Sequence, residues 1–587
     1  MQPKRAMQFV TIILVAVSMT GCQQLKDVFG SRPSANMPVF KPVDVQFADQ
    51  NWSPDQRAWF YHAAQGTELL PYKWFLALEQ PKLQLFGSVP KFADSAYLTR
   101  FGFLPDPATP ENPDGLPVGF AKDTITDVNT GERVEVVGLN CAACHTGQLE
   151  YKGKGIRIDG GPANADLASF QTELGYAVAF TDKIPFRFDR FARAVLGYNA
   201  SDDDKKKLRQ QFEAFLNAGL AEKDAADAGK LYAAAGGFGR TDALGRIGNY
   251  VFGTELDNVN LRPANAPVDF PPLWYTSWFG WVQYNASIQQ PMVRNIGEAL
   301  GVRARVNLKD PDKLYRSTVN VKSQWEMESL LAGATAFNGL KAPAWPTAVF
   351  GPVDQAKAQQ GAQLYQQMCQ RCHLPPLNSP EIQDPKYWEP GQQGKTFLKL
   401  NVIPLDEIGT DPREATDWAS RTAVTGVLGL GTVSAAEGLR AVTGKIRDMN
   451  YDAMNLSPEQ RAEWSGFRDA GVVAPLAYRA RPLGGMWATP PFLHNGSVPN
   501  LYQLLSPVEK RDKTFYVGSR EFDPNLVGYS TAEMEGAYEF RTDQPNDPHP
   551  GNSNAGHEFR NGGGKGVIGR ELSDEERRAI IEYLKTL

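Results

Sequence analysis

Two short stretches decide how this chain folds: Cys141-Ala-Ala-Cys144-His145 and Cys369-Gln-Arg-Cys372-His373. Each stretch places two thiols three residues apart and an imidazole directly after them. This spacing is typical of covalent haem c attachment, because two thiols on one helical turn can reach both haem vinyl groups while the next histidine lies beneath the iron. We expect two haem c groups, with His145 and His373 as proximal iron ligands.

Two other kinds of site also use cysteine pairs. A Cys-x-x-Cys pair can form a redox disulfide, and clusters of Cys and His can bind zinc. Neither explains a histidine directly after the second cysteine in both motifs, and a zinc site normally needs a further cysteine pair close by. Apart from Cys22, the chain has no cysteine outside the two motifs. The pattern therefore favours haem.

Composition bounds the class of protein. The chain has 587 residues, and 61 Lys and Arg against 66 Asp and Glu give a net charge of −5, which excludes a general nucleic-acid binder. A hydrophobic content of 42% is ordinary for a globular protein. The chain is much longer than a simple electron carrier needs to cover two porphyrins. The excess favours an enzyme or binding protein, although loops that merely bury two cofactors are the alternative.

The N-terminus carries a targeting signal. Lys4 and Arg5 precede an apolar stretch, Phe9 to Met19, of 11 residues, which is too short to span a bilayer. The following Met19-Thr-Gly-Cys22 resembles the lipobox of bacterial lipoproteins, with an ordinary signal peptide as the alternative. The resemblance implies lipidation of Cys22 and a periplasmic chain attached by lipid only, and the Gln23 that follows favours the outer membrane.

The organisation that we predict has four parts. Residues 1–21 are the signal peptide and 22–45 a linker. Residues 46–345 form an N-terminal haem domain with a large insertion, and 346–587 form a C-terminal haem domain. The boundary follows the Pro-rich segment 342–346.

Helix signals surround the second motif. Asp354 can cap a helix that leads to Cys369, and Ser573 with Glu576 forms a capping box for an amphipathic helix at the chain end. Ser457 marks another helix start. Earlier in the chain, segments 56–80 and 203–216 look helical. We therefore predict a mainly α fold: two cytochrome c-like haem domains with long loop-rich insertions and little β-structure.

Histidine positions bear on the open face of each iron. No histidine lies between 145 and 373, so a sixth ligand for the first haem from downstream in its own domain would be Met292 or Met327, or be absent. An open position would bind dioxygen or peroxide. His62 could reach back, yet a lone His beside two aromatic residues is more often packed or hydrogen-bonded. The second haem has several candidates in its own domain and is predicted to be six-coordinate. Those candidates are His494, His549, His557, Met486 and Met534.

The second motif, together with the stretch Leu483-Gly-Gly-Met-Trp-Ala-Thr-Pro-Pro-Phe-Leu-His-Asn-Gly-Ser497, resembles the bacterial di-haem cytochrome c peroxidase superfamily. The long chain, the aromatic run 274–284 and Gly556-His-Glu-Phe559 look most like its rubber-oxygenase-like branch. The resemblance implies an open, catalytic first haem and His557 as the sixth ligand of the second. It also implies that His494 lies beside that haem, near its propionates.

One departure from the shorter peroxidases matters. They carry a further histidine after the first motif, which blocks that iron until reductive activation, and this chain has none before His373. The first site thus looks constitutively open, and peroxide reduction cannot simply be carried over. Spacing does not place a distal acid/base residue; Arg294 and Glu298 are candidates, although a surface ion pair is the favoured interpretation.

The aromatic segment between the motifs has three interpretations. It could line an apolar pocket over the open haem, carry electrons between haems, or pack the core between domains. Trp274, Trp278 and Trp281 recur at spacings of four and three, which predicts one helical face. We include Trp281 among the candidate catalytic residues.

We expect a periplasmic oxidoreductase that reduces hydrogen peroxide at the haem on His145. The haem on His373 would relay electrons from a small periplasmic donor. One alternative is an oxygenase that uses dioxygen to cleave double bonds of an apolar, polyisoprenoid-like substrate. Another is a pure electron-transfer lipoprotein with both irons saturated.

Overall fold

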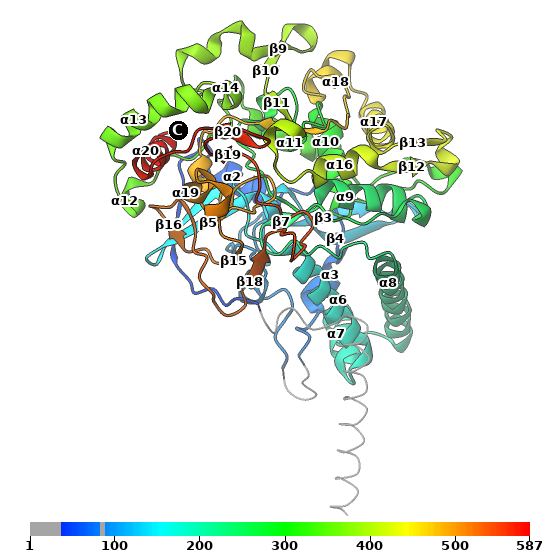
Figure 1. Cartoon of the computed structure of the whole chain (residues 1–587). Helices are drawn as coiled ribbons and strands as arrows, with labels where there is room; N and C mark the ends of the chain where they lie inside the picture. Colours follow the sequence, from blue (N-terminus) through cyan, green and yellow to red (C-terminus); the bar gives the residue numbers. More distant parts are fainter. Residues whose placement is uncertain (1–36, 83–87) are drawn as a thin grey trace, which may run out of the picture.

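The computed structural model describes residues 37–82 and 88–587, so the lipobox with Cys22 lies outside the described residues. Helices and many small sheets alternate along the chain, with about 40% of residues in helices and 16% in strands (Figure 1). The prediction of a mainly α fold with little β-structure is wrong, and the fold is mixed α/β. Each strand has two to seven residues, too few for alternation to stand out between Gly- and Pro-rich turns.

The first motif joins two three-stranded sheets. One sheet has the order β2-β4-β3, and its strand β4 leads into the motif; the other has the order β1-β6-β5, and its strand β5 follows the motif directly. The strands are β1 (Asp44–Phe47), β2 (Leu70–Pro71), β3 (Phe120–Thr126), β4 (Arg133–Leu139), β5 (Thr146–Tyr151) and β6 (Lys154–Asp159), and the motif forms α5 (Cys141–Cys144). The thiols are therefore held on a short helical turn between two rigid strands.

An aromatic core and a group of helices cover these sheets. The helices are α2 (Pro54–His62), α3 (Tyr72–Ala77), α4 (Ser95–Thr99), α6 (Leu167–Lys183), α7 (Arg187–Leu196) and α8 (Asp202–Ala228). The helix predicted at 203–216 is confirmed within α8. The helix predicted over 56–80 is broken into α2, β2 and α3, because Gly66 takes a left-handed φ of 80° against the backbone of Thr318.

A second core lies around α10, which packs against α9, α11 and α17. Its elements are β7 (Arg240–Thr241), α9 (Ala243–Gly248), β8 (Val268–Asp269), α10 (Pro291–Gly301), α11 (Val321–Ala332), α16 (Arg413–Ser420), β12 (Thr422–Val424), β13 (Thr432–Ser434), α17 (Ala435–Ala453) and α18 (Pro458–Trp464). The helix start predicted at Ser457 is confirmed by its capping box.

The shared helical face predicted for the three tryptophans is wrong. Only Thr276–Trp278 is helical there, as one 3₁₀ turn, because Tyr275 has a left-handed φ of 67°.

The second motif directly follows a helix that packs against the C-terminal helix. Helix α13 (Gln355–Met368) leads into α14 (Gln370–His373), and α13 lies against α20 (Asp574–Leu584) (Figure 1). The predicted Asp354 cap and the Ser573 capping box are confirmed. The remaining elements are α12 (Thr347–Phe350), β9 (Trp388–Pro390), β10 (Thr396–Leu398), β11 (Asn401–Pro404), α15 (Leu405–Ile408), β14 (Ala477–Ala480), α19 (Leu501–Leu504), β15 (Thr514–Val517), β16 (Phe522–Asp523), β17 (Gly528–Tyr529), β18 (Tyr538–Arg541), β19 (Glu558–Phe559) and β20 (Val567–Gly569).

The parts of the chain on either side of residue 345 share a core. Trp52 and Phe60 belong to the same buried cluster as Trp487 and Ile580. The division at 345/346 stays a prediction. Within the two described ranges, no helix is both long and apolar enough to cross a membrane.

Gly361 sets how closely α13 and α20 approach. A Cβ at this position would lie 2.0 Å from the backbone oxygen of Ala579. We therefore expect Gly361→Ala to lower the free energy of unfolding by about 2 kcal/mol, since neither backbone can move without losing core contacts. The measurement is thermal unfolding followed by circular dichroism.

Gly444→Ala in α17 is the matched control. A Cβ there meets no atom within 4 Å, so this change should stabilise the helix by up to about 1 kcal/mol. Equal melting temperatures for the two variants would contradict the close packing of α13 on α20.

Candidate haem sites

A large cavity opens beside the second motif. Its volume is about 1560 Å³, including the solvent-filled space at its open end, and its walls are mainly apolar. Cys369, Cys372 and His373 line it together with His494 and His557. The donor set and the apolar walls of this cavity fit a covalently attached haem.

The ring of His373 is fixed for metal binding. Its Nδ1 donates to the carbonyl oxygen of Arg481 at 2.7 Å, which leaves Nε2 for iron. Burial lowers the pKa of His373, so the imidazole is neutral, as a ligand must be.

His557 faces His373 across the cavity. The two ring centroids are 6.0 Å apart. Two imidazoles that bind one metal ion from opposite sides at about 2 Å would bring their centroids to roughly 6 Å. The Nδ1 of His557 is buried and has no hydrogen-bond partner among the described residues, and burial lowers the pKa of His557 to about 3. The distance between the two rings therefore matches that expected if both imidazoles held one iron.

The other predicted ligands are engaged differently. His494 lines the cavity but stacks on Tyr478, with ring centroids 4.1 Å apart. The Sδ of Met486 accepts a hydrogen bond from Thr489. His549 pairs with Asp547, and neither it nor Met534 is among the lining residues.

Asn140 positions the first motif. Its side chain caps the motif helix at the backbone N–H of Ala142 and donates to three carbonyl groups at the end of α2, those of Phe60, Tyr61 and Ala63. Sequence reasoning missed this residue, although an Asn directly before a predicted helical turn is a capping signal.

The first motif presents two neutral thiols and a neutral imidazole. Burial raises the pKa of Cys141 and of Cys144 to about 12, and all four motif cysteines are free thiols. The Nδ1 of His145 donates to the carbonyl oxygen of Pro271 at 2.7 Å, and burial lowers the pKa of His145 to about 4. Both histidines are thus oriented in the same way.

The candidates for a sixth ligand at the first site are engaged elsewhere. Both ring nitrogens of His62 are hydrogen-bonded, to the carbonyl of Phe120 at 2.8 Å and to Asp106 at 3.0 Å, which confirms it as a packed residue. Met327 accepts a hydrogen bond from Gln65, which also donates to Cys141. Met292 is fully buried in the second core.

A polar cluster lies near the first motif. Arg294 forms an ion pair with Glu328, and each side chain is only 10% exposed, so the predicted surface ion pair is wrong and the pair is buried. Gln283 donates to Glu298 at 3.0 Å. Burial raises the pKa of Glu298, and the charges of Glu298 and Arg294 both act on the thiol of Cys141. The tertiary fold therefore brings Arg294 and Glu298 close enough to the first motif for their charges to act on Cys141.

Trp274, rather than Trp281, contacts Gly484 and Arg481 next to the large cavity. Trp274 is fully buried and donates from its indole N–H to the carbonyl of Gly484 at 2.9 Å. The guanidinium of Arg481 lies 5.7 Å from its ring centroid. Trp281 is half-buried beside Gly471.

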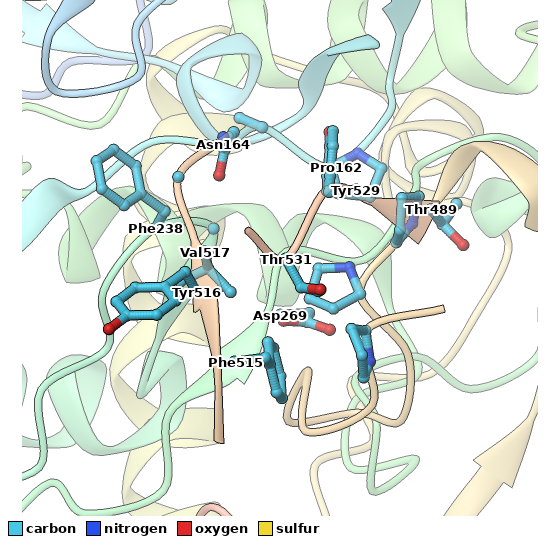
Figure 2. A pocket seen from close by; sticks show the side chains of 16 residues that line it. Pro162, Asn164, Phe238, Asp269, Thr489, Phe515, Tyr516, Val517, Tyr529 and Thr531 are labelled. Atoms are coloured by element: carbon cyan, nitrogen blue, oxygen red, sulfur yellow. The ribbon is translucent and has the colours of Figure 1, made fainter. Parts of the chain in front are cut away.

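A smaller pocket adjoins the large cavity (Figure 2). The two share Pro162, Asp269, Thr489 and Pro491. Burial raises the pKa of Asp269 well above its usual range, and its Oδ1 has no hydrogen-bond partner among the described residues. The carboxyl group of Asp269 therefore stands at the boundary between the two spaces.

Comparison with known proteins identifies the family. The chain is 46% identical over 580 residues to "Uncharacterized protein y4iJ" of Sinorhizobium fredii (strain NBRC 101917 / NGR234), which covers 94% of this chain and 95% of that protein. The chain belongs to the family of this protein. A second relative from the same organism, "Uncharacterized protein y4iM", is 26% identical over 277 residues, 46% of this chain and 51% of that protein.

A family description adds chemistry. Residues 477–516 match the family described as RoxA-like, cytochrome c-like. This segment contains β14, Arg479, Arg481 and the stretch that carries the superfamily resemblance. The match supports the rubber-oxygenase-like haem branch, covalent haem c and a haem-dependent oxidoreductase.

The facing rings at the second site give a direct prediction. We expect His557→Ala to convert the low-spin electron paramagnetic resonance signal of the haem on His373 to a high-spin signal, because the iron loses one of two strong-field ligands. His494→Ala is the matched control in the same cavity and should keep the low-spin signal. Loss of that signal in His494→Ala alone would reverse the assignment.

Proposed function

We propose that this protein is a periplasmic di-haem c oxidoreductase that reduces hydrogen peroxide at the site of His145, with electrons supplied through the site of His373. The observation that carries the proposal is the buried cluster of Arg294, Glu328 and Glu298 beside the first motif. Haem c, when bound, supplies the redox-active iron that exchanges electrons with a small oxidant. Peroxide takes up two electrons and two protons and yields two water molecules.

At the first site, each protein residue has a separate task. His145 would hold the iron from one side through a ring that Pro271 orients. The carboxyl group of Glu298 can accept a proton from peroxide and return it to the departing oxygen. The charge of Arg294 favours the negative charge that develops on that oxygen.

At the second site, His373 and His557 would saturate the iron, so that this site passes electrons but binds no small molecule. Trp274 lies beside Arg481, whose guanidinium is 5.7 Å from its ring centroid. A small periplasmic protein is the proposed electron donor. The net charge of −5 argues against nucleic acid as a partner.

A second candidate function has its own support. The RoxA-like match over residues 477–516 favours an oxygenase that cleaves double bonds of an apolar, polyisoprenoid-like substrate with dioxygen at the same open site. A pure electron carrier is less well supported, because His62 and Met327 already have hydrogen-bond partners.

The test is a pair of measurements on purified, air-oxidised protein. We expect one high-spin and one low-spin ferric signal, and we expect peroxide to consume the high-spin signal while a reduced donor is oxidised. A high-spin iron that ignores peroxide, together with carbonyl products from polyisoprene in air, would favour the oxygenase. Two low-spin signals that do not respond would leave only the electron carrier.

Glu298→Gln sharpens this test. The rate with peroxide should fall by about 10²-fold or more, whereas Glu326→Gln on the exposed side of α11 should leave it unchanged. Because burial raises the pKa of Glu298, the rate of the unchanged protein should fall as the pH is lowered through a value above the usual range for glutamate, about 4.3. This acid limb should be absent in Glu298→Gln.

We also propose that a lipid on Cys22 attaches the protein to the outer membrane. The support is the lipobox-like sequence before Cys22. We expect the unchanged protein in the membrane fraction of the cell envelope and Cys22→Ser in the soluble periplasmic fraction. Equal distribution of the two forms would contradict a lipid anchor.

A further inference from the structure

Arg481 touches the supports of both motif histidines. Its carbonyl oxygen accepts the hydrogen bond from Nδ1 of His373 at 2.7 Å. Its Nη1 donates to the carbonyl oxygen of Pro272 at 3.3 Å. The preceding carbonyl, that of Pro271, accepts the hydrogen bond from Nδ1 of His145. One residue therefore joins the two segments that orient the two imidazoles.

Two nitrogens of the Arg481 guanidinium have no hydrogen-bond partner among the described residues. The side chain is buried, with the residue 9% exposed, and its Nε and Nη2 make no hydrogen bond within the described part of the chain. Arg481 also lines the large cavity. A buried guanidinium with two unpaired N–H donors has lost its hydrogen bonds to water, which costs free energy. A ligand that accepts hydrogen bonds from these donors would remove this cost.

The charge around Arg481 also lacks a counterion. Arg479 lines the same cavity, and neither arginine forms an ion pair with a carboxylate among the described residues. The ionisable groups that act on Arg481 are Arg479, Tyr284 and Tyr275. Glu414 is the carboxyl group among the described residues that acts on Arg479, and burial raises its pKa to about 8, which favours its neutral form at neutral pH. Two buried positive charges therefore face the cavity uncompensated.

The other carboxyl groups of the cavity do not supply the missing anion. Asp269 faces Arg240 instead, and Glu407 shares the cavity wall without an ion pair to either arginine among the described residues. A haem c group carries two propionate carboxylates, and a carboxylate matches the fork of a guanidinium. A haem bound in this cavity would therefore supply the missing carboxylate.

We propose that Arg481 is a positioning residue shared by both haem sites: it binds a propionate of the haem on His373 while its backbone and guanidinium hold the supports of His373 and His145. The inference rests on the proposed function to the extent that both motifs carry haem. It goes beyond that proposal, because it assigns to one arginine the electrostatic link between the two sites. Arg479 adds charge to the same cavity.

The positive charge has a consequence for redox behaviour. A nearby cation disfavours the ferric state, which carries one more positive charge than the ferrous state. Removing it should lower the midpoint potential of the haem on His373. We expect about a tenfold change in the ratio of oxidised to reduced haem at fixed ambient potential, which for one electron is about 59 mV.

The experiment is a spectroelectrochemical titration of the full protein, with haem content measured on each sample. Arg481→Gln should keep both haems and lower the potential of the haem on His373, and Arg481→Lys, which keeps the charge but not the fork, should lie between it and the unchanged protein. The matched control is Arg421→Gln. Arg421 is equally buried but binds Asn249 and the carbonyl of Asn260, away from the cavity, so both potentials should stay unchanged.

An Arg481→Gln protein with both haems and the potentials of the Arg421→Gln control would overturn the proposal. Should Arg481→Gln fail to fold, Arg481→Lys decides, and unchanged potentials at both haems would overturn it as well. These readouts do not depend on peroxide. A protein that shows the shift but consumes no peroxide would therefore support the role of Arg481 and refute the peroxidase.

Discussion

The arrangement of both sites depends on two hydrogen bonds from imidazole to backbone carbonyl, His145 to Pro271 and His373 to Arg481. Each bond fixes the tautomer and the direction of a ring, and a ligand that could rotate would not hold a metal in one geometry. The carbonyl groups come from segments more than 100 residues away from the histidines that they orient. The segment between the motifs carries one acceptor to its ring, and the segment after the second motif carries the other.

Charged side chains also lie buried near both motifs. The pair of Arg294 and Glu328 compensates itself, whereas Arg479 and Arg481 face a cavity without a carboxylate partner among the described residues. A buried ion pair shifts the pKa values of neighbouring groups, whereas a buried charge without a partner indicates a missing anionic ligand. The two sites thus differ in character: an acid/base cluster adjoins the first, and a cationic cavity surrounds the second.

The sequence predicted correctly those features that depend on neighbouring residues, such as helix caps. The caps at Asp354, Ser457 and Ser573 were predicted because a capping side chain bonds to a backbone N–H only two or three residues away. The small sheets escaped prediction, since a pair of two-residue strands such as β7 and β8 is defined by its partner rather than by its own pattern. The tryptophan spacing suggested a helix, but the left-handed turn at Tyr275 overrides a period of three or four.

The sequence by itself determined the covalent chemistry. Two thiols and an imidazole must be neighbours along the chain to bind one haem, so both Cys-x-x-Cys-His motifs are visible in the sequence. Only the tertiary structure decided what surrounds them. It brought His557 to 6.0 Å from His373, buried Arg294 beside Cys141 and placed Arg481 between the supports of both histidines. These contacts join residues up to about two hundred positions apart, and such distances are set by the packing of separate elements, which no spacing within one segment encodes.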